Sequence, residues 1–254
     1  MAKSPRPMCR RWWRAFSGSP ANKPIKVYSF PRSGTHWLMS LLKARFYASV
    51  SSDDVIQDFG MHGDFYNHKG KSTIVPWMFL FGGHWYHPKN VPERLDRAVY
   101  ILRDGIDTIY STWTLLNSRK DGSPGPLDDY IQLNTHAVDP NPIPVGASVA
   151  AHWHWSTKLW MVSDALIIRY EDLLQNHRLQ LDRVETRFNL RSGQTNEDPA
   201  KIPVGFLIDG VCKGVGAGRK NFPESSIAFF NNSEKEADAI LAKDPWYQER
   251  AHAP

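Results

Sequence analysis

The chain has 254 residues, of which 41% are hydrophobic and 22% charged, a composition that excludes a disordered or fibrous protein and fits one well-packed domain. Its net charge of +5 favours an anionic partner, such as a nucleic acid, an acidic lipid or a polyanionic cofactor. Two cysteines exclude a disulfide framework and a structural zinc site, and no apolar run approaches the roughly 20 residues that span a bilayer, so we expect a cytoplasmic protein.

Residues 1–23 form a basic arm that is rich in proline and serine, with Cys9-Arg-Arg-Trp-Trp-Arg14 near its centre. Neighbouring arginine and tryptophan side chains suit a membrane interface, so peripheral membrane contact is one expectation for the arm. The simpler interpretation, which we favour, is an arm whose tryptophans pack on the domain. The domain itself is predicted to occupy residues 24–254.

The first predicted unit is a strand followed by a turn and a helix. Residues 25–30 form a short β-rich run, after which apolar residues recur at helical spacing, at Leu38, Leu41, Leu42 and Phe46. Backbone N–H groups at a helix start have no intrahelical partner and the helix dipole adds positive charge, so a phosphate or sulfate binds there. Arg32 adds a full charge to this turn. The turn lacks the G-x-x-x-x-G-K-[ST] spacing of a P-loop ATPase, so the unit is P-loop-like without a Walker A lysine.

Two further units repeat the pattern. Residues 97–102 indicate a buried strand, and a helical stripe follows at Ile106, Ile109, Tyr110, Trp113 and Leu116. Residues 165–168 indicate a third strand, and the next helix is predicted to bury Leu173, Leu174, His177, Leu181, Val184 and Phe188. This alternation predicts a single-domain α/β fold in which helices flank a central parallel sheet.

Charged or hydroxyl-bearing residues follow every predicted strand: Arg32 with Ser33, Arg103 with Asp104, and Arg169 with Tyr170. Because parallel sheets bind ligands beyond the carboxyl ends of their strands, these residues mark the predicted site. Residues 121–146 are rich in proline, glycine, asparagine and aspartate, and predict a long loop that either covers an acceptor site or is a surface excursion. Residues 147–161 predict a helix that packs on the core.

These segments together resemble the sulfotransferases that use 3′-phosphoadenosine 5′-phosphosulfate (PAPS). The turn Tyr28-Ser-Phe-Pro-Arg-Ser-Gly-Thr-His-Trp37 is similar to the 5′-phosphosulfate loop of that family. The segment Tyr100-Ile-Leu-Arg-Asp-Gly-Ile-Asp-Thr-Ile-Tyr-Ser111 is similar to its 3′-phosphate motif. Arg169-Tyr-Glu-Asp-Leu173, and Lys213-Gly214 leading to Lys220-Asn221, extend the resemblance over roughly residues 26–222.

The resemblance implies a sulfotransferase domain in residues 24–254 with a two-ended nucleotide site. The 5′ end would bind the loop residues Arg32, Ser33, Gly34, Thr35 and His36, and Arg32 would also neutralise charge on the bridging oxygen as the S–O bond breaks. Trp37 would stack on the adenine, although a core role is an alternative for this tryptophan. The 3′-phosphate would bind the residues Arg103, Ser111, Lys213 and Gly214.

The resemblance also places Tyr170 in the nucleotide site, and two assignments besides Trp37 have structural alternatives. Arg103 at a strand end would, without the family spacing to Ser111, be interpreted as an ion-pair partner of Asp104 or Asp107. Tyr170 either contacts the nucleotide or packs beside it.

Sulfuryl transfer to a hydroxyl group needs a base that takes the acceptor proton. Within Phe79-Leu-Phe-Gly-Gly-His-Trp-Tyr-His-Pro88, the family's catalytic histidine matches His84 best, and His87 is the second candidate. His36 is poorly placed for this role because it belongs to the phosphosulfate loop. The expected acceptor is a hydroxyl-bearing small molecule, lipid or glycan and not a nucleic acid, the nucleotide product is 3′-phosphoadenosine 5′-phosphate (PAP), and no metal is required.

The sequence departs from the family pattern at several positions. Arg32 stands where lysine is common, and Gly82 replaces a lysine that often precedes the base. Cys212 occupies the place of an arginine beside the 3′-phosphate, and Arg219, which replaces a tryptophan, is a candidate to compensate for that loss.

Two alternative functions stay open. The strand-loop-helix anion site is shared with nucleotide-dependent kinases, and the departures from the family pattern leave a catalytically weak nucleotide-binding module whose basic arm docks on an anionic surface.

Overall fold

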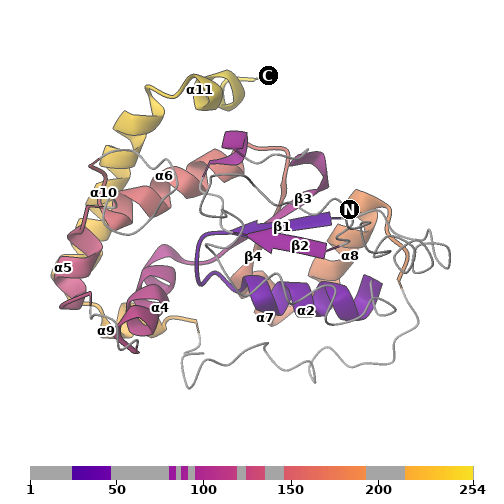
Figure 1. Ribbon diagram of the computed structural model, residues 1–254, viewed down its shortest axis with the longest axis horizontal. Helices are drawn as coiled ribbons and strands as arrows, with labels where there is room; N and C mark the ends of the chain where they lie inside the picture. Colours follow the sequence, from indigo (N-terminus) through magenta and orange to yellow (C-terminus); the bar gives the residue numbers. More distant parts are fainter. Residues whose placement is uncertain are drawn as a thin grey trace, which may run out of the picture.

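The structure, a computed structural model, describes residues 25–46, 80–83, 87–90, 95–118, 124–134, 146–192 and 215–253. At its centre lies a parallel sheet in the order β2-β1-β3-β4, with helices around it (Figure 1). The strands are β1 (Ile25–Ser29), β2 (Leu80–Gly83), β3 (Ala98–Leu102) and β4 (Leu166–Arg169). The mixed α/β fold with a parallel sheet is the fold class that the sequence predicts.

Helices connect and cover the strands. They are α2 (Thr35–Phe46), α4 (Gly105–Ser118), α5 (Leu127–Gln132), α6 (Val149–Met161), α7 (Tyr170–Gln175), α8 (His177–Phe188), α9 (Ala217–Asn221), α10 (Glu224–Leu241) and α11 (Pro245–Ala251). The short 3₁₀ turns η2 (Pro88–Asn90) and η3 (Leu95–Arg97) precede β3. Within the described ranges, no helix combines the length and apolarity that crossing a bilayer requires.

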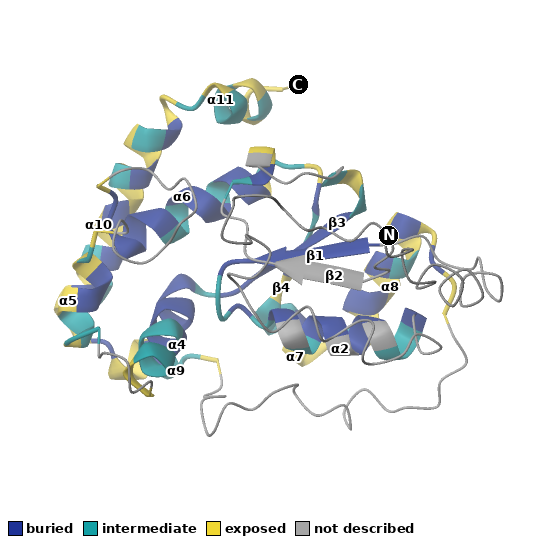
Figure 2. Ribbon diagram, in the orientation of Figure 1, coloured by how far each residue is buried: buried dark blue, intermediate teal, exposed yellow. Residues whose placement is uncertain are grey.

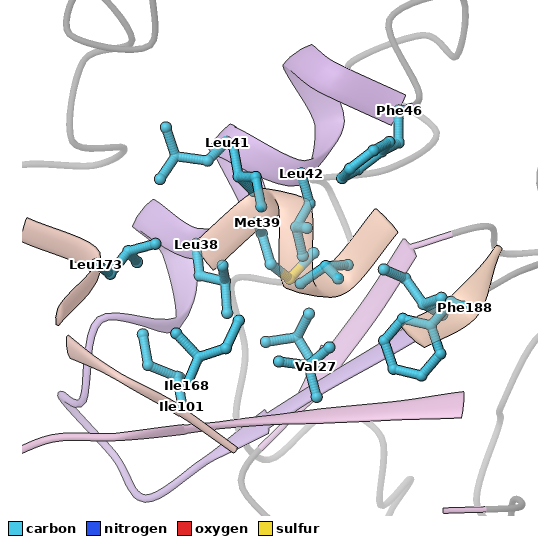
Figure 3. Close-up of a cluster of buried hydrophobic side chains, with 14 of the residues drawn as sticks. Val27, Leu38, Met39, Leu41, Leu42, Phe46, Ile101, Ile168, Leu173 and Phe188 are labelled. Carbon is cyan, nitrogen blue, oxygen red and sulfur yellow. The ribbon is translucent and has the colours of Figure 1, made fainter. Parts of the chain in front are cut away.

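The sheet is buried on both faces because successive strand residues point to opposite sides. On one face Val27, Ile101 and Ile168 pack with Leu38 of α2 and with α8 (Figure 3). On the other face Tyr100 stacks on Trp160 of α6, with ring centroids 4.6 Å apart. The register, in which Val27 pairs with Val99 and Ile101 with Ile168, aligns the carboxyl ends of β1, β3 and β4 at one edge.

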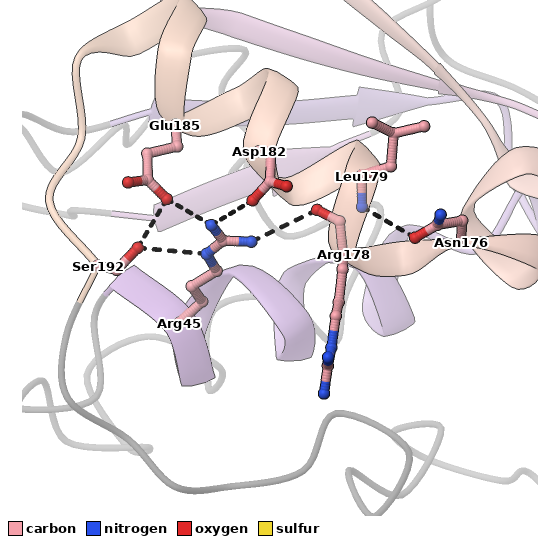
Figure 4. Close-up of polar contacts among 7 residues, drawn as sticks. All are labelled: Arg45, Asn176, Arg178, Leu179, Asp182, Glu185 and Ser192. Carbon is pink, nitrogen blue, oxygen red and sulfur yellow. Dashed lines mark hydrogen bonds and ion pairs between the residues drawn. The ribbon is translucent and has the colours of Figure 1, made fainter.

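Two polar contacts hold the outer helices in place. Arg45 of α2 forms ion pairs with Asp182 and Glu185 of α8 (Figure 4). Lys158 of α6 lies 2.9 Å from Glu234 of α10, and α6 and α10 run side by side with their buried residues facing inward (Figure 2).

The structure corrects two predictions about secondary structure. The helix expected after the third strand is two helices, because the side chain of Asn176 accepts a hydrogen bond from the N–H of Leu179 and thereby caps α8. In the short helix α7 the buried residue is Leu173, and Leu174, predicted as buried, is 44% exposed. The loop expected over 121–146 contains α5, which forms because Tyr130 and Ile131 bury their side chains against α4 and α6.

Candidate functional site

The turn between β1 and α2, residues 30–34, is called the anion loop here. Two of its residues, Arg32 at φ 68° and Gly34 at φ 97°, have left-handed backbone conformations that turn the chain sharply into the helix. The N–H of Ser33 donates to the carbonyl of Phe30 at 3.3 Å. Ser33 is 1% exposed, and its hydroxyl has no hydrogen-bond partner within the described part of the chain, so the loop holds a polar group that a ligand would satisfy.

The ring of Tyr170 packs against the anion loop at Gly34. A Cβ atom added to Gly34 would lie only 2.5 Å from Cδ2 of Tyr170 and 3.4 Å from Ile101, so the loop approaches this ring more closely than any side chain allows. Trp37 meets the same ring edge-to-face, with centroids 5.8 Å apart. Tyr170 therefore contacts the loop and the tryptophan that the resemblance places on the adenine.

Replacing Gly34 with alanine is expected to lower the free energy of unfolding by about 3 kcal/mol, since left-handed strain and overpacking against Tyr170 add together. Gly125→Ala is the matched control, because Gly125 has a similar φ of 81° and no atom of the described residues outside its two chain neighbours lies within 4 Å of the added Cβ. It should lose only about 1 kcal/mol from backbone strain. Thermal unfolding of both variants measures the difference, and equal losses would show that Tyr170 does not press on the loop.

The carboxyl end of β3 brings a second cation to the anion loop. Arg103 is 7% exposed, and its Nη1 donates to the carbonyl oxygen of Arg32 at 3.1 Å. Its guanidinium lies 4.8 Å from the centre of the Tyr170 ring, in cation–π contact. Arg32 in turn donates from Nε to the Ser111 hydroxyl at 3.3 Å. The structure therefore places Arg32, Arg103, Ser111 and Tyr170 together.

The acidic residues that follow Arg103 accept hydrogen bonds from elsewhere in the fold. Asp104 accepts from Arg219 at 3.0 Å, and the N–H of Asp104 donates to Glu171 at 3.0 Å. Arg219 thus lies beside the strand end that carries Arg103, although its charge is paired with a carboxylate. Lys213 and Gly214 lie outside the described residues, as does the basic arm, and the side chain of His36 is not described.

Of the two histidines proposed as the base, His84 lies outside the described residues and His87 has both ring nitrogens engaged. The N–H of Lys89 donates to Nδ1 of His87 at 3.0 Å, so Nε2 carries the proton and donates to Asp244 at 2.9 Å. Burial lowers the pKa of His87 although Asp244 opposes the shift. Its ring packs between Trp155 and Trp246, which gives it a structural place between α6 and α11.

His152 of α6, which sequence reasoning did not assign to the site, borders the anion loop. Its ring lies 5.2 Å from that of Phe30 and is tilted against Trp155. The side chain is 4% exposed, and burial lowers the pKa of the imidazole to about 3. A lone histidine in a helix gives no signal of such burial, since only the fold brings Phe30 to it.

His152 should make stability depend on pH. The unfolded chain binds a proton on this ring below its ordinary pKa of 6.5, whereas the folded protein binds it only near pH 3, so the stabilisation is complete above pH 6.5 and is lost as the pH falls towards 3. Between about pH 6 and 4, His152→Gln should flatten the slope of unfolding free energy by up to about 1.4 kcal/mol per pH unit. His87 and His154, whose pKa values are also lowered, are common to both proteins and cancel. Identical slopes in urea titrations would contradict a buried neutral imidazole.

Comparison with known proteins supports the fold. The structure is similar to the crystal structure of mouse sulfotransferase SULT7A1 complexed with PAP, with a TM-score of 0.54 and 16% sequence identity over 96% of this chain and 93% of that one. A scan against models of protein families finds no match to the sequence, and a search of curated proteins finds none either. The chain therefore has a sulfotransferase-like fold.

Proposed function

We propose that the protein is a sulfotransferase that moves a sulfuryl group from PAPS to the hydroxyl group of a small molecule, lipid or glycan. The observation that carries the proposal is the meeting of three residues at the carboxyl edge of the sheet: Arg32 and Arg103, which follow β1 and β3, and Ser111 of α4. Ligands of open parallel sheets bind at this edge. The similarity of the fold to that of a sulfotransferase complexed with PAP supports the proposal.

The residues of the anion loop fit the 5′ end of such a nucleotide. The close packing of this loop on Tyr170 leaves no room for a side chain at Gly34, so only the backbone of this residue would contact the nucleotide. The N–H groups of Gly34, Thr35 and His36 would donate to the anion, whereas that of Ser33 already donates to Phe30. The buried Ser33 hydroxyl would gain a partner. Trp37 would stack on the adenine, with Tyr170 behind it.

The other end of the site would bind the 3′-phosphate. Arg103 offers a planar fork that suits two charge-assisted hydrogen bonds, and Ser111 offers a hydroxyl. Lys213 and Gly214 complete this end in the proposal, on the strength of the sequence resemblance. The cation–π contact with Tyr170 restricts the orientations of the Arg103 guanidinium, which favours binding because less side-chain freedom is lost.

In the proposed reaction, the acceptor oxygen forms a bond to sulfur while the bond from sulfur to the bridging oxygen of PAPS breaks. The proton of the acceptor hydroxyl passes to His84. The electron pair of the broken bond stays on the phosphate oxygen, where Arg32 neutralises the developing charge. Most of the rate enhancement would come from positioning and charge stabilisation, as in phosphoryl transfer.

Two measurements on the purified protein test the proposal: calorimetric titration with PAP, and label transfer from radioactive PAPS to a broad panel of hydroxyl acceptors. Binding of PAP together with transfer to any acceptor supports it. PAP binding without transfer would favour a nucleotide-binding module. Thermal stabilisation by Mg·ATP but not by PAP would favour a kinase. Absence of PAP binding overturns the proposal.

A further inference from the structure

The carboxylate of Asp107, in the first turn of α4, holds the start of α9, which lies far away in the sequence. Asp107 is 1% exposed, and its two oxygens accept the backbone N–H groups of Gly216 and Gly218, each at 2.7 Å. Gly216 has a φ of 82°, a left-handed conformation that turns its N–H towards the carboxylate. Hydrogen bonds to a charged group are about twice as strong as neutral ones, so this contact ties α9 firmly to α4.

Only glycine fits at position 218 beside the carboxylate of Asp107. A Cβ atom at position 218 would lie 2.7 Å from the carbonyl oxygen of Ile106 and 2.8 Å from Oδ1 of Asp107. Both atoms belong to the first turn of α4, and a Cβ at either distance would force the helix or the carboxylate to shift. Asp107 and Gly218 therefore form a matched pair.

A second set of contacts places this pair beside the proposed nucleotide site. Asp104, which directly follows Arg103, accepts the N–H of Asp107 at 3.0 Å and also pairs with Arg219 of α9. Glu171 of α7 accepts the N–H of Asp104. The turn after Arg103, the first turn of α4 and the start of α9 thus form one hydrogen-bonded network.

We propose that Asp107 is a positioning residue for the 3′-phosphate end of the nucleotide site. It lies between Arg103 and Ser111 in the chain and fixes Gly216, which closely follows the pair Lys213-Gly214. The inference rests on the proposed function, in which that pair binds the 3′-phosphate. Asp107 acts through Gly216 and Gly218, whose N–H groups it binds to the same helix that carries Ser111.

The test compares PAP with 5′-AMP, which lacks the 3′-phosphate. Asp107→Asn keeps the shape of the side chain but turns an amide towards one of the two N–H donors, so affinity for PAP should fall about tenfold while affinity for 5′-AMP stays within about twofold. Gly218→Ala damages the same contact from the α9 side and should give the same selective loss. Asp129→Asn, at an exposed carboxylate of α5, is the control and should leave both affinities unchanged.

The positioning role also predicts how losses combine. If Asp107 acts through Lys213, the double variant Asp107→Asn, Lys213→Ala should lose less binding free energy for PAP than the two single variants lose in sum. Unchanged PAP affinity in Asp107→Asn, or equal losses for PAP and 5′-AMP, would overturn the inference, and Gly218→Ala decides in the same way if Asp107→Asn does not fold. A wild-type protein that fails to bind PAP would overturn the proposed function itself, which separates the two failures.

Discussion

Arg103→Ala is expected to weaken PAP binding by about a hundredfold. The Arg103 guanidinium is largely buried, donates to the carbonyl of Arg32 at 3.1 Å and stacks on Tyr170. In the proposed site it presents two donors to the 3′-phosphate, so alanine would remove both bonds and the stacked cation in one step. Calorimetric titration with PAP measures the loss, and 5′-AMP should lose much less affinity because it has no 3′-phosphate.

Arg97→Ala is the matched control for this experiment. Arg97 precedes β3 at its amino end and lies 5.6 Å from the ring of Phe188, so the substitution removes the same charge and a similar stacked contact at the opposite end of the same strand. PAP affinity should stay within about twofold of the wild-type value. A similar loss in both variants would mean that net charge or strand stability, and not a phosphate contact, explains the effect of Arg103→Ala.

His84→Ala should lower the turnover number of sulfuryl transfer by about a thousandfold while leaving PAP affinity unchanged, because a general base contributes to the chemical step and not to nucleotide binding. Initial rates at saturating PAPS, combined with PAP titration, measure the two effects separately. The acid limb of the pH–rate profile should disappear in the variant. Turnover at the wild-type rate would show that another group takes the proton.

His87→Ala is the variant to compare with His84→Ala, since both ring nitrogens of His87 are hydrogen-bonded. Its Nε2–H donates to Asp244 and its Nδ1 accepts the N–H of Lys89, which leaves no lone pair for an acceptor proton. The substitution should lower thermal stability, because Asp244 also caps α11, and it should leave the turnover number close to the wild-type value. Abolished turnover in the folded variant would place the base at His87.

Much of the fold follows from local patterns in the sequence. The runs around Val99 and Ile168 are continuously apolar, which is typical of strands covered on both faces, and the sheet that contains them is parallel. The break at Asn176 was missed because an apolar period of helical spacing runs across it. The Asn176 side chain accepts the N–H of Leu179 in place of a backbone carbonyl, and this ends one helix and starts the next. The spacing of apolar residues contains no information about such a hydrogen bond.

The site could be predicted only in part. The resemblance to the family motifs singles out Arg32, Arg103 and Ser111. The fold brings them together because Arg32 and Arg103 follow neighbouring strands and α4, which carries Ser111, begins just after Arg103. The contact between Gly34 and the Tyr170 ring was not predictable, since it depends on how α7 follows β4. The same holds for the pairing of His87 with Asp244, two residues separated by 157 positions that meet only through the packing of α11.

The strand order has a consequence for the synthesis of the chain. β1 emerges first from the ribosome, yet it lies inside the sheet and pairs with β2 and β3, both of which are made much later. Closing such long loops before any strand pairing is gained makes parallel sheets slow to form. The anion loop packs against the ring of Tyr170. A nascent chain that ends before Tyr170 therefore lacks a contact that restricts the conformation of the loop. Nucleotide binding should therefore arise late during translation, once β4 and α7 have joined the sheet.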